Sequence, residues 1–201
     1  MTTKRTTANA KPRANSPSAR RLPLTASRQE LLVDGNDQTL RRMTLGFAVL
    51  GWLLTDIRGG FSKLLDISPF QYVALQAIAR VQPDEPWTTR SLAEHFHVTN
   101  PYVSVELRGL LSKNYLEAQP SLLDRRSKHL VVTPSGVELL TWLAPVQQHV
   151  NDTLYQQFDS KGLVRQCEVI EQMIKNAEAA DQYLRALVAE RGPRKRKPVK
   201  P

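Results

Sequence analysis

The chain has 201 residues, with 28 Lys or Arg against 19 Asp or Glu and a formal net charge of +9. This length allows one hydrophobic core with additional segments. Its single cysteine, Cys167, excludes a framework of intrachain disulfides. No run of about 18 apolar residues occurs and the N-terminal segment lacks the apolar core of a secretory signal, so we expect a soluble, intracellular protein with no membrane association.

The positive charge is concentrated at the two ends of the chain. Residues 1–28 contain seven Lys or Arg and no acidic residue, and residues 191–201 contain six and none. The stretch between them carries 15 basic and 19 acidic residues, a net charge of −4. Because the N-terminal segment has almost no large apolar residue before Leu22, we predict disordered basic tails at residues 1–36 and 191–201.

Residues 37–66 show the apolar spacing of one long helix. Apolar side chains recur at steps of three and four, which predicts a helix from about Asp37 to Leu65. That is longer than a small core needs. The stripe consists of Leu40, Met43, Phe47, Leu50, Leu54, Ile57, Phe61 and Leu64.

The next segment predicts a helix-turn-helix. Ser68 caps a helix that begins with Pro69, and Thr88 caps another; after a turn at Val98, Thr99 caps a third, which runs to about Lys113. We expect this last helix to bury Val103, Leu107, Leu110 and Leu111 and to expose Asn100, Tyr102, Ser104, Val105 and Arg108. Such an exposed face can enter a DNA major groove.

A basic hairpin follows this helix. Asn114 occupies a position that needs a left-handed backbone, and two strands are predicted at residues 115–119 and 128–133. The loop between them, residues 120–127, holds a carboxylate and two guanidinium groups. Arginines at a hairpin tip reach phosphates or a narrow minor groove, and the acid is placed to hold one of them in a bidentate pair. These residues are Asp124, Arg125 and Arg126, with Lys128 just beyond.

Two more helices are predicted in residues 137–190. The first starts near Pro134, and the second follows a break at Asp159 and Ser160 and continues to about Val188. Both are apolar on one face, which predicts either a covered core or a two-fold dimer interface. We favour the dimer.

The segment from Ile67 to Gly136 resembles the MarR-type (multiple antibiotic resistance regulator family) winged helix-turn-helix regulators. The resemblance rests on ISPFQYVAL, SLAEHFHVT, LLSKNYLEAQ and DRRSKHLVVTPSG and on the spacing between them. It implies a mainly α fold with a small β-wing, in which a winged helix-turn-helix domain at residues 67–136 is flanked by N- and C-terminal dimerisation helices. Many members carry Arg where Val105 stands and one or two more at Ala118 and Gln119, so contacts there do not carry over.

The expected DNA-binding residues lie on the two helices of the motif and on the wing. Arg108 can bond a guanine edge or a phosphate, and Asn100 can serve the helix start instead of a base. The two hairpin arginines can also be solvated charges, but the resemblance favours DNA contact. The full set is Thr89, Arg90, Asn100, Pro101, Tyr102, Ser104, Arg108, Arg125, Arg126 and Lys128.

A small-molecule site is suggested on the long first helix. Arg58 flanks its apolar stripe, where a charge needs a partner. The resemblance implies that aromatic carboxylates or phenolic compounds bind near Trp52 and Tyr72, and such an anion would pair with Arg58. The alternative is a salt bridge from Arg58 to Asp56 or Asp66 of a partner subunit.

Catalytic and metal-binding constellations are missing from the sequence. There is no Gly-rich phosphate loop and no G-x-S-x-G motif. His95 and His97 are two residues apart, a spacing that points side chains on a helix to different faces, so we expect no metal site. Cys167 lies on a helical apolar stripe, which predicts a packed thiol; a peroxide-sensing thiol is the alternative.

Together these features predict a homodimeric transcriptional regulator and not an enzyme. We expect a repressor that binds a double-stranded, pseudo-palindromic operator and leaves it when a small effector, an aromatic carboxylate or a phenolic compound, shifts the spacing of its two recognition helices. No other cofactor is expected. The protein would act in a prokaryotic cytoplasm, associated with the nucleoid. The alternatives are a sequence-tolerant DNA-packaging protein dominated by its basic tails and a redox-sensing regulator that uses Cys167.

Overall fold

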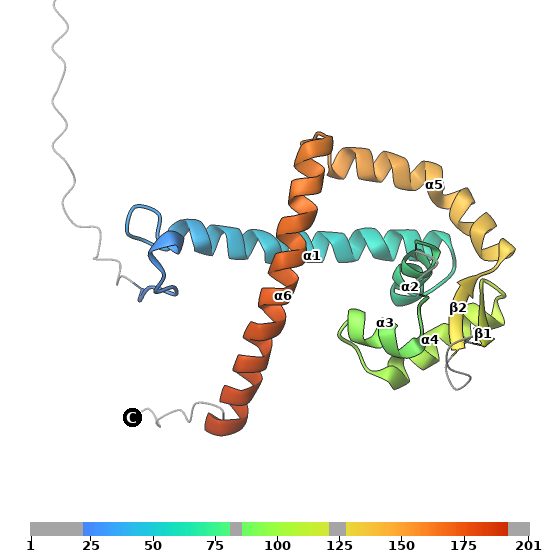
Figure 1. The fold of residues 1–201 in the computed structure, drawn as a ribbon. Helices are drawn as coiled ribbons and strands as arrows, with labels where there is room; N and C mark the ends of the chain where they lie inside the picture. Colours follow the sequence, from blue (N-terminus) through green and yellow to red (C-terminus); the bar gives the residue numbers. More distant parts are fainter. Residues whose placement is uncertain (1–21, 81–85, 121–127, 193–201) are drawn as a thin grey trace, which may run out of the picture. The chain divides into compact units, whose positions relative to one another are not determined.

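The computed structural model describes residues 22–80, 86–120 and 128–192. They form mostly helices and one two-stranded antiparallel sheet, as predicted (Figure 1). The chain divides into two compact units, Met1–Ala77 and Ile78–Pro201. Helix α2, Pro69–Ala79, crosses this division, so the units do not separate at the predicted boundary near residue 66.

The first unit begins with a short folded segment where a disordered tail was predicted. Residues 22–36 include a 3-10 turn at Gln29–Leu31 and an isolated bridge between Val33 and Asn36. The prediction of disorder was therefore wrong for these residues. Their order comes from polar contacts with the start of α1, which composition does not reveal.

Asp37 is the centre of those contacts. Its carboxylate is buried and accepts hydrogen bonds from the Thr25 amide and hydroxyl, both at 2.7 Å. Arg41 donates to the same carboxylate at 2.9 Å and to the Pro23 carbonyl at 2.7 Å. The segment is thus fastened to the N-terminal end of α1.

Helix α1 spans Gln38–Leu64, close to the predicted bounds. Only its C-terminal end carries buried residues, Phe61 and Ser62, and the Phe61 ring packs 5.3 Å from the ring of Tyr72. The rest of the predicted stripe is exposed or half-buried within the single chain. The exposed apolar residues of α1 are Met43, Leu45, Phe47, Val49, Leu50, Trp52, Leu53 and Leu64.

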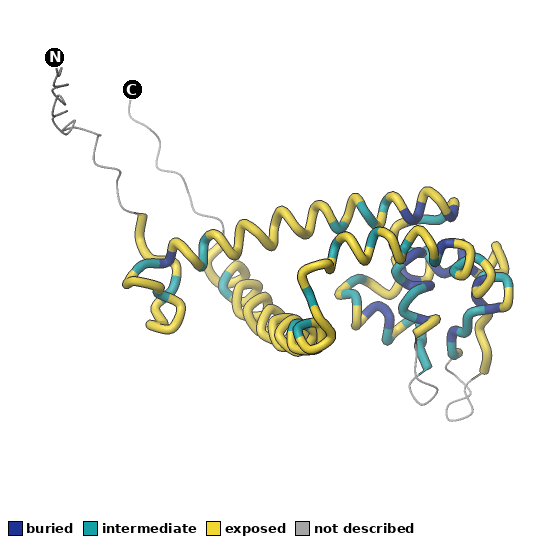
Figure 2. Tube along the Cα trace, turned by 90° about the horizontal axis from the view of Figure 1, so that it is seen from above, coloured by how far each residue is buried: buried dark blue, intermediate teal, exposed yellow. Residues whose placement is uncertain are grey.

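The second unit contains the compact core. It comprises α3 (Thr89–His95), α4 (Asn100–Ser112), β1 (Leu116–Pro120), β2 (Lys128–Val132), α5 (Pro134–Leu154) and α6 (Ser160–Arg191). Strands β1 and β2 pair antiparallel from Leu116 opposite Val132 to Pro120 opposite Lys128. Figure 2 shows buried residues gathered around the short helices and the sheet. The fully buried side chains of this unit include Leu92, Val103, Leu110, Leu116 and Leu143.

Helices α5 and α6 begin at capped ends and extend beyond this core. Asp159 caps α6 by accepting from the Gly162 amide at 2.7 Å. None of the 32 residues of α6 is buried. Cys167 is exposed, so the prediction of a packed thiol does not hold within the single chain.

Of the helices in the described ranges, none is both long and apolar enough to cross a membrane.

Candidate nucleic-acid interface

Helix α3 is the supporting helix of the motif. Thr88 and Ser91 form a reciprocal capping box, with the Thr88 amide donating to Ser91 Oγ at 2.9 Å and the Ser91 amide to Thr88 Oγ1 at 3.0 Å. Leu92 and Ala93 are buried and form its apolar face. The helix ends where His97 adopts a positive φ of 53°, which lets the chain turn sharply toward α4.

Helix α4 occupies the position of a recognition helix. Thr99 Oγ1 caps it by accepting from the Tyr102 amide at 3.4 Å. Val103, Leu107 and Leu110 are buried and fix its rotation about its own axis. Leu111 was predicted to complete this stripe but is exposed, because it lies at the edge of the stripe on the last turn of the helix.

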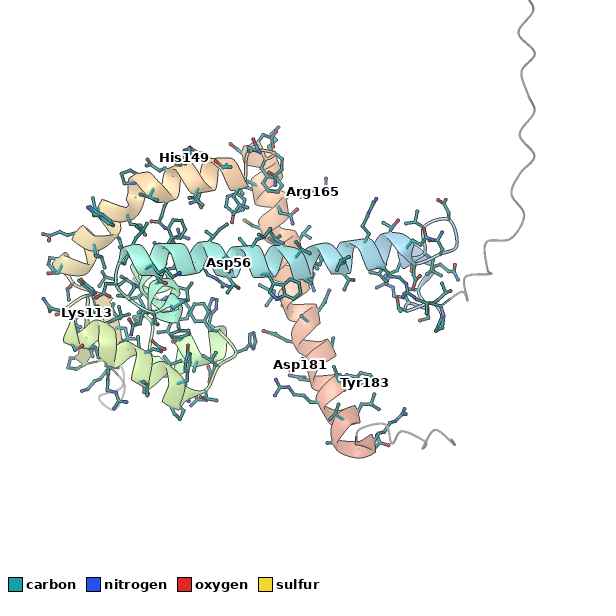
Figure 3. The ribbon with its side chains drawn as sticks, turned by 180° about the vertical axis from the view of Figure 1, so that it is seen from behind. Asp56, Lys113, His149, Arg165, Asp181 and Tyr183 are labelled. Atoms are coloured by element: carbon teal, nitrogen blue, oxygen red, sulfur yellow. The ribbon has the colours of Figure 1, made fainter. Side chains whose placement is uncertain are left out.

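The opposite face of α4 is open to solvent. The predicted DNA-binding residues of this helix are all exposed: Asn100, Pro101, Tyr102, Ser104 and Arg108. Lys113, labelled in Figure 3, is exposed just after the helix and adds a positive charge that the predicted set did not include. The face therefore offers neutral side chains in its first turns and positive charge toward its C-terminal end.

Two side chains of the interface have an acidic partner on their own helix. Arg90 on α3 pairs with Glu94 at 2.8 Å, which raises the pKa of the guanidinium. Tyr102 on α4 is hydrogen-bonded to Glu106; partial burial, the charge of Glu106 and this bond together raise the pKa of the phenol. Glu106 was not singled out from the sequence, although its i, i+4 spacing from Tyr102 is a readable signal.

The C-terminal end of α4 closes with a Schellman motif. Asn114 has a φ of 56°, as predicted for this position. The Tyr115 amide donates to the Leu110 carbonyl at 2.9 Å, and the Asn114 amide donates to the Leu111 carbonyl at 3.0 Å. The chain therefore leaves α4 in a fixed direction and enters β1.

Thr133 joins the helix end, the sheet and α5. Its hydroxyl donates to the Asn114 carbonyl at 2.6 Å and accepts from the Gly136 amide at 3.1 Å, while its own amide donates to the Tyr115 carbonyl at 3.2 Å. The side chain is buried. One residue thus caps α5 and holds the base of the wing against the end of α4.

The wing is fixed to the start of the motif as well. The Leu130 amide of β2 donates to the Trp87 carbonyl at 2.8 Å, just before α3. Lys128, the first residue of β2, is exposed. The predicted wing residues Arg125 and Arg126, with Asp124, lie outside the described residues.

Comparison with known proteins gives matches among solved structures. A MarR transcriptional regulator from Methanosarcina mazei Go1 matches with a TM-score of 0.54 and 17% identity, over 70% of this chain and 99% of that chain. A regulator MarR from Oenococcus oeni PSU-1 gives 0.55 and 17%, over 66% and 98%. The S. aureus MepR–DNA complex gives 0.53 and 21%, over 66% and 96%. No family model and no curated relative matches the sequence.

The chain has the fold of the MarR-type winged helix-turn-helix regulators. In this MarR fold, α3 and α4 form the helix-turn-helix and β1 and β2 form the wing (Figure 1). The predicted fold class is confirmed.

The residues of the predicted ligand site occupy different environments in the MarR fold of this chain. Trp52 is 71% exposed, and Arg58 is exposed and donates to Thr55 Oγ1 at 2.9 Å. Six residues along a helix correspond to about 120° of rotation, so Trp52 and Arg58 face different directions from α1. Tyr72 is buried against Phe61. A ligand held by α1 alone would not contact all three.

The described part of the chain contains no group of three or more His, Cys, Asp or Glu residues placed to hold a metal ion. His95 ends α3 and contacts the rings of Trp87 and Phe96 at 5.0 and 4.9 Å. His97 lies in the turn that follows. The pair therefore does not share a helix, contrary to the geometry assumed for it, and His95 is part of an aromatic cluster.

Proposed function

We propose that this protein is a DNA-binding transcriptional regulator that inserts α4 into the major groove. The observation that carries the proposal is the exposed face of α4, held at both ends by capping contacts and tied through Thr133 to the wing. A helix that is held at both ends and linked to the wing can present its side chains to base edges in one register. The geometry of the described residues suits the recognition of DNA rather than the catalysis of a reaction.

The solved structures support this assignment. The S. aureus MepR–DNA complex has the same fold, with a TM-score of 0.53. The other two structures compared are MarR transcriptional regulators. Identity of about one residue in five gives no contact residue by transfer, so the DNA-binding residues are proposed from the geometry of this chain.

The positions of the charged side chains fit a protein in which α4 reads the bases while basic side chains contact the DNA phosphates. Arg108, Lys113 and Lys128 are exposed on the same unit, while Arg90 is paired with Glu94. Phosphate contacts supply affinity without sequence information, whereas base contacts supply specificity. We assign Arg108, Lys128 and the basic tails mainly to the first role, and Asn100, Tyr102 and Ser104 to the second.

The protein acts as a homodimer in this proposal. Helix α6 exposes a long series of apolar residues, and an amphipathic helix of this kind needs a covering surface. Four glycines of α1, Gly46, Gly51, Gly59 and Gly60, have open space where a Cβ would project. Each costs about 0.5–1 kcal/mol relative to Ala in a helix, which is understandable where another backbone approaches closely. A second copy supplies both surfaces and the two-fold axis of a pseudo-palindromic operator.

The regulator is proposed to be a cytoplasmic, nucleoid-associated repressor released by a small effector. An aromatic acid is the preferred class because Arg58 offers an exposed guanidinium for its carboxylate. Trp52 offers an exposed ring on another side of α1, so one acid does not contact both from α1 alone. Titration of benzoate-like and hydroxycinnamate-like acids, followed by tryptophan fluorescence and operator release, tests this. Release that is equal in the original protein and in Arg58→Ala removes Arg58 as anchor, and no effect of any such acid removes the aromatic-effector proposal.

A thiol-sensing regulator is a second candidate, favoured by the exposure of Cys167 in the single chain. It requires that the thiol stays accessible in the proposed dimer. Peroxide treatment should then lower operator affinity in the original protein but not in Cys167→Ser. Equal responses of the two proteins exclude this role for the thiol.

A genome-wide binding map followed by footprinting tests the proposed function. We expect a small number of strong sites near promoters and a footprint with two half-sites separated by about one helical turn, 10–10.5 base pairs. Even coverage of the genome would instead support the DNA-packaging alternative.

A further inference from the structure

The outermost residue of the recognition helix is apolar. Val105 lies two residues from both Val103 and Leu107, which are buried, and is therefore about 160° from each around the helix axis. It is 55% exposed, so its side chain projects away from the core. If α4 enters a major groove, Val105 is the side chain that points most directly at the base pairs.

The neighbours of Val105 on this strip of α4 are known from the helix period. Pro101 lies four residues earlier and is exposed on nearly the same line. Arg108 follows three residues later and is exposed beside the strip. The first two turns thus present an apolar pair, with positive charge only further along the helix.

Flanking polar groups do not take over the central position. Tyr102 and Arg108 are the nearest polar side chains, each about 60° from Val105 but on opposite sides of it. The Tyr102 hydroxyl is hydrogen-bonded to Glu106. Both are turned toward one side of the strip, at angles of about 60° and 100° from Val105. The polar readers Asn100 and Ser104 lie on the other side, each about 100° or more from Val105. The centre of the face is left to the valine.

The chemistry of the groove limits what this centre can recognise. Base edges in the major groove present hydrogen-bond donors and acceptors, and the one apolar group among the four standard bases is the 5-methyl of thymine. A valine placed over the other edges would leave their polar groups without partners, which costs affinity. An apolar side chain at this position therefore favours a thymine and disfavours a G·C pair.

We infer that Val105, supported by Pro101, reads thymine 5-methyl groups at the centre of each operator half-site. The inference rests on the proposed function and names the sequence element that α4 recognises there. Val105 is a specificity-determining residue in this account, while Asn100 and Ser104 contact bases to one side of it and Arg108 mainly contacts the DNA backbone.

Uracil scanning of the operator tests the inference. Uracil differs from thymine by the missing 5-methyl alone and pairs with adenine in the same way. After an operator has been selected, each thymine is replaced by uracil in turn, and the affinity of the full-length protein is measured at physiological salt. We expect one or two positions per half-site to lose about fourfold, the value for one buried methyl group. Replacement in both half-sites should lose about the square of that factor.

Two variants connect the effect to the residue. In Val105→Ala the uracil effect should fall to less than twofold at the same positions. Val137→Ala on α5 is the matched control, because Val137 is 52% exposed and lies outside the recognition helix; it should keep the full effect. Circular dichroism confirms that both variants are folded, as the exposure of both side chains leads us to expect.

The outcomes separate this inference from the proposed function. A protein without any preferred sequence overturns both. A protein with a preferred operator whose thymines all tolerate uracil, or whose uracil effect is unchanged in Val105→Ala, overturns the inference and leaves the proposed function intact.

Discussion

Gly136 is the third residue of α5 and has no room for a side chain. A Cβ at this position would overlap the backbone oxygen of Tyr115 and come within 2.7 Å of a Val132 methyl. Both neighbours belong to the sheet and the end of α4, so neither can move without disturbing the wing. This is the physical reason for the glycine in the segment TPSG, residues 133–136.

Gly136→Ala should therefore destabilise the protein by about 1–3 kcal/mol, the usual cost of overpacking. Urea unfolding measures it. Glu138→Ala, two residues later on the exposed side of the same helix, is the control and should change stability by less than about 0.5 kcal/mol. Equal stabilities of the two variants would show that the wing adjusts freely, against this account.

Asp37 gives the N-terminal segment a dependence on pH. Hydrogen bonds from Arg41 and then from Thr25 hold the pKa of this carboxyl well below its usual range. A carboxyl whose pKa is lower in the folded state stabilises the fold above its unfolded pKa, and the contribution is lost as pH falls toward the folded pKa. The contacts of Asp37 with Thr25 and Arg41, which we call the Asp37 clasp, should thus be fully formed at neutral pH and weaken below about pH 4.

Amide hydrogen exchange at Thr25 reports on this clasp. At neutral pH we expect protection in the original protein and rapid exchange in Asp37→Ala, with α1 still helical. Lowering the pH below about 4 should bring the original protein toward the variant, once both are corrected for intrinsic exchange. A Thr25 amide equally protected in both proteins would mean that other contacts hold the segment.

At the scale of elements, Thr133 connects three parts of the candidate interface. Its hydroxyl is shared between the Asn114 carbonyl and the Gly136 amide. Removing it leaves the partly buried Asn114 carbonyl without this donor and α5 without its cap. The position of the wing relative to α4 depends on this side chain.

Thr133→Ala is expected to lose about 1–2 kcal/mol of stability, combining a lost helix cap with the loss of the hydrogen bond to the Asn114 carbonyl. DNA affinity should fall as well, because the wing is no longer held in place. Thr133→Ser keeps the hydroxyl and should recover most of both losses. Calorimetric melting and operator titration of the two variants provide the test; a serine variant as weak as the alanine variant would place the effect in the methyl group instead.

The elements of the interface were largely predictable from the sequence because their signals are local. Thr88 and Thr99 cap helices where predicted, and Asn114 adopts the left-handed backbone expected of it. Burial was less predictable. Leu111 and Cys167 lie on apolar stripes but are exposed. An apolar stripe shows which face of a helix tends to be buried, but it does not show whether the same chain buries it.

At the scale of the whole molecule, the order of residues 22–36 was not predictable from composition. It depends on side-chain hydrogen bonds across 12 residues between Thr25 and Asp37, which leave no periodic pattern in the sequence. The effector site was likewise predicted from resemblance. Trp52 is exposed and Tyr72 is buried, and their joint role in binding an effector stays a prediction.

The exposed apolar face of α6 leads to a prediction about assembly. The protein should sediment as a dimer at micromolar concentration, and Ile174→Glu should raise the dimer dissociation constant at least tenfold by placing a charge in the interface. Gln172→Glu adds the same charge on another side of α6 and should leave the dimer intact. A monomeric original protein, or equal dissociation of the two variants, would contradict the assignment of α6 to the interface.

Sequence-specific DNA binding is the central claim, and one affinity ratio tests it most directly. The full-length protein is titrated with its selected operator and with a scrambled duplex of equal length and composition, both at about 150 mM salt. A regulator that reads bases through α4 should bind the operator at least about 1,000 times more tightly, the lower end for specific DNA-binding proteins. A ratio near one, with strong salt dependence for both duplexes, would contradict the account and assign the binding to the basic tails.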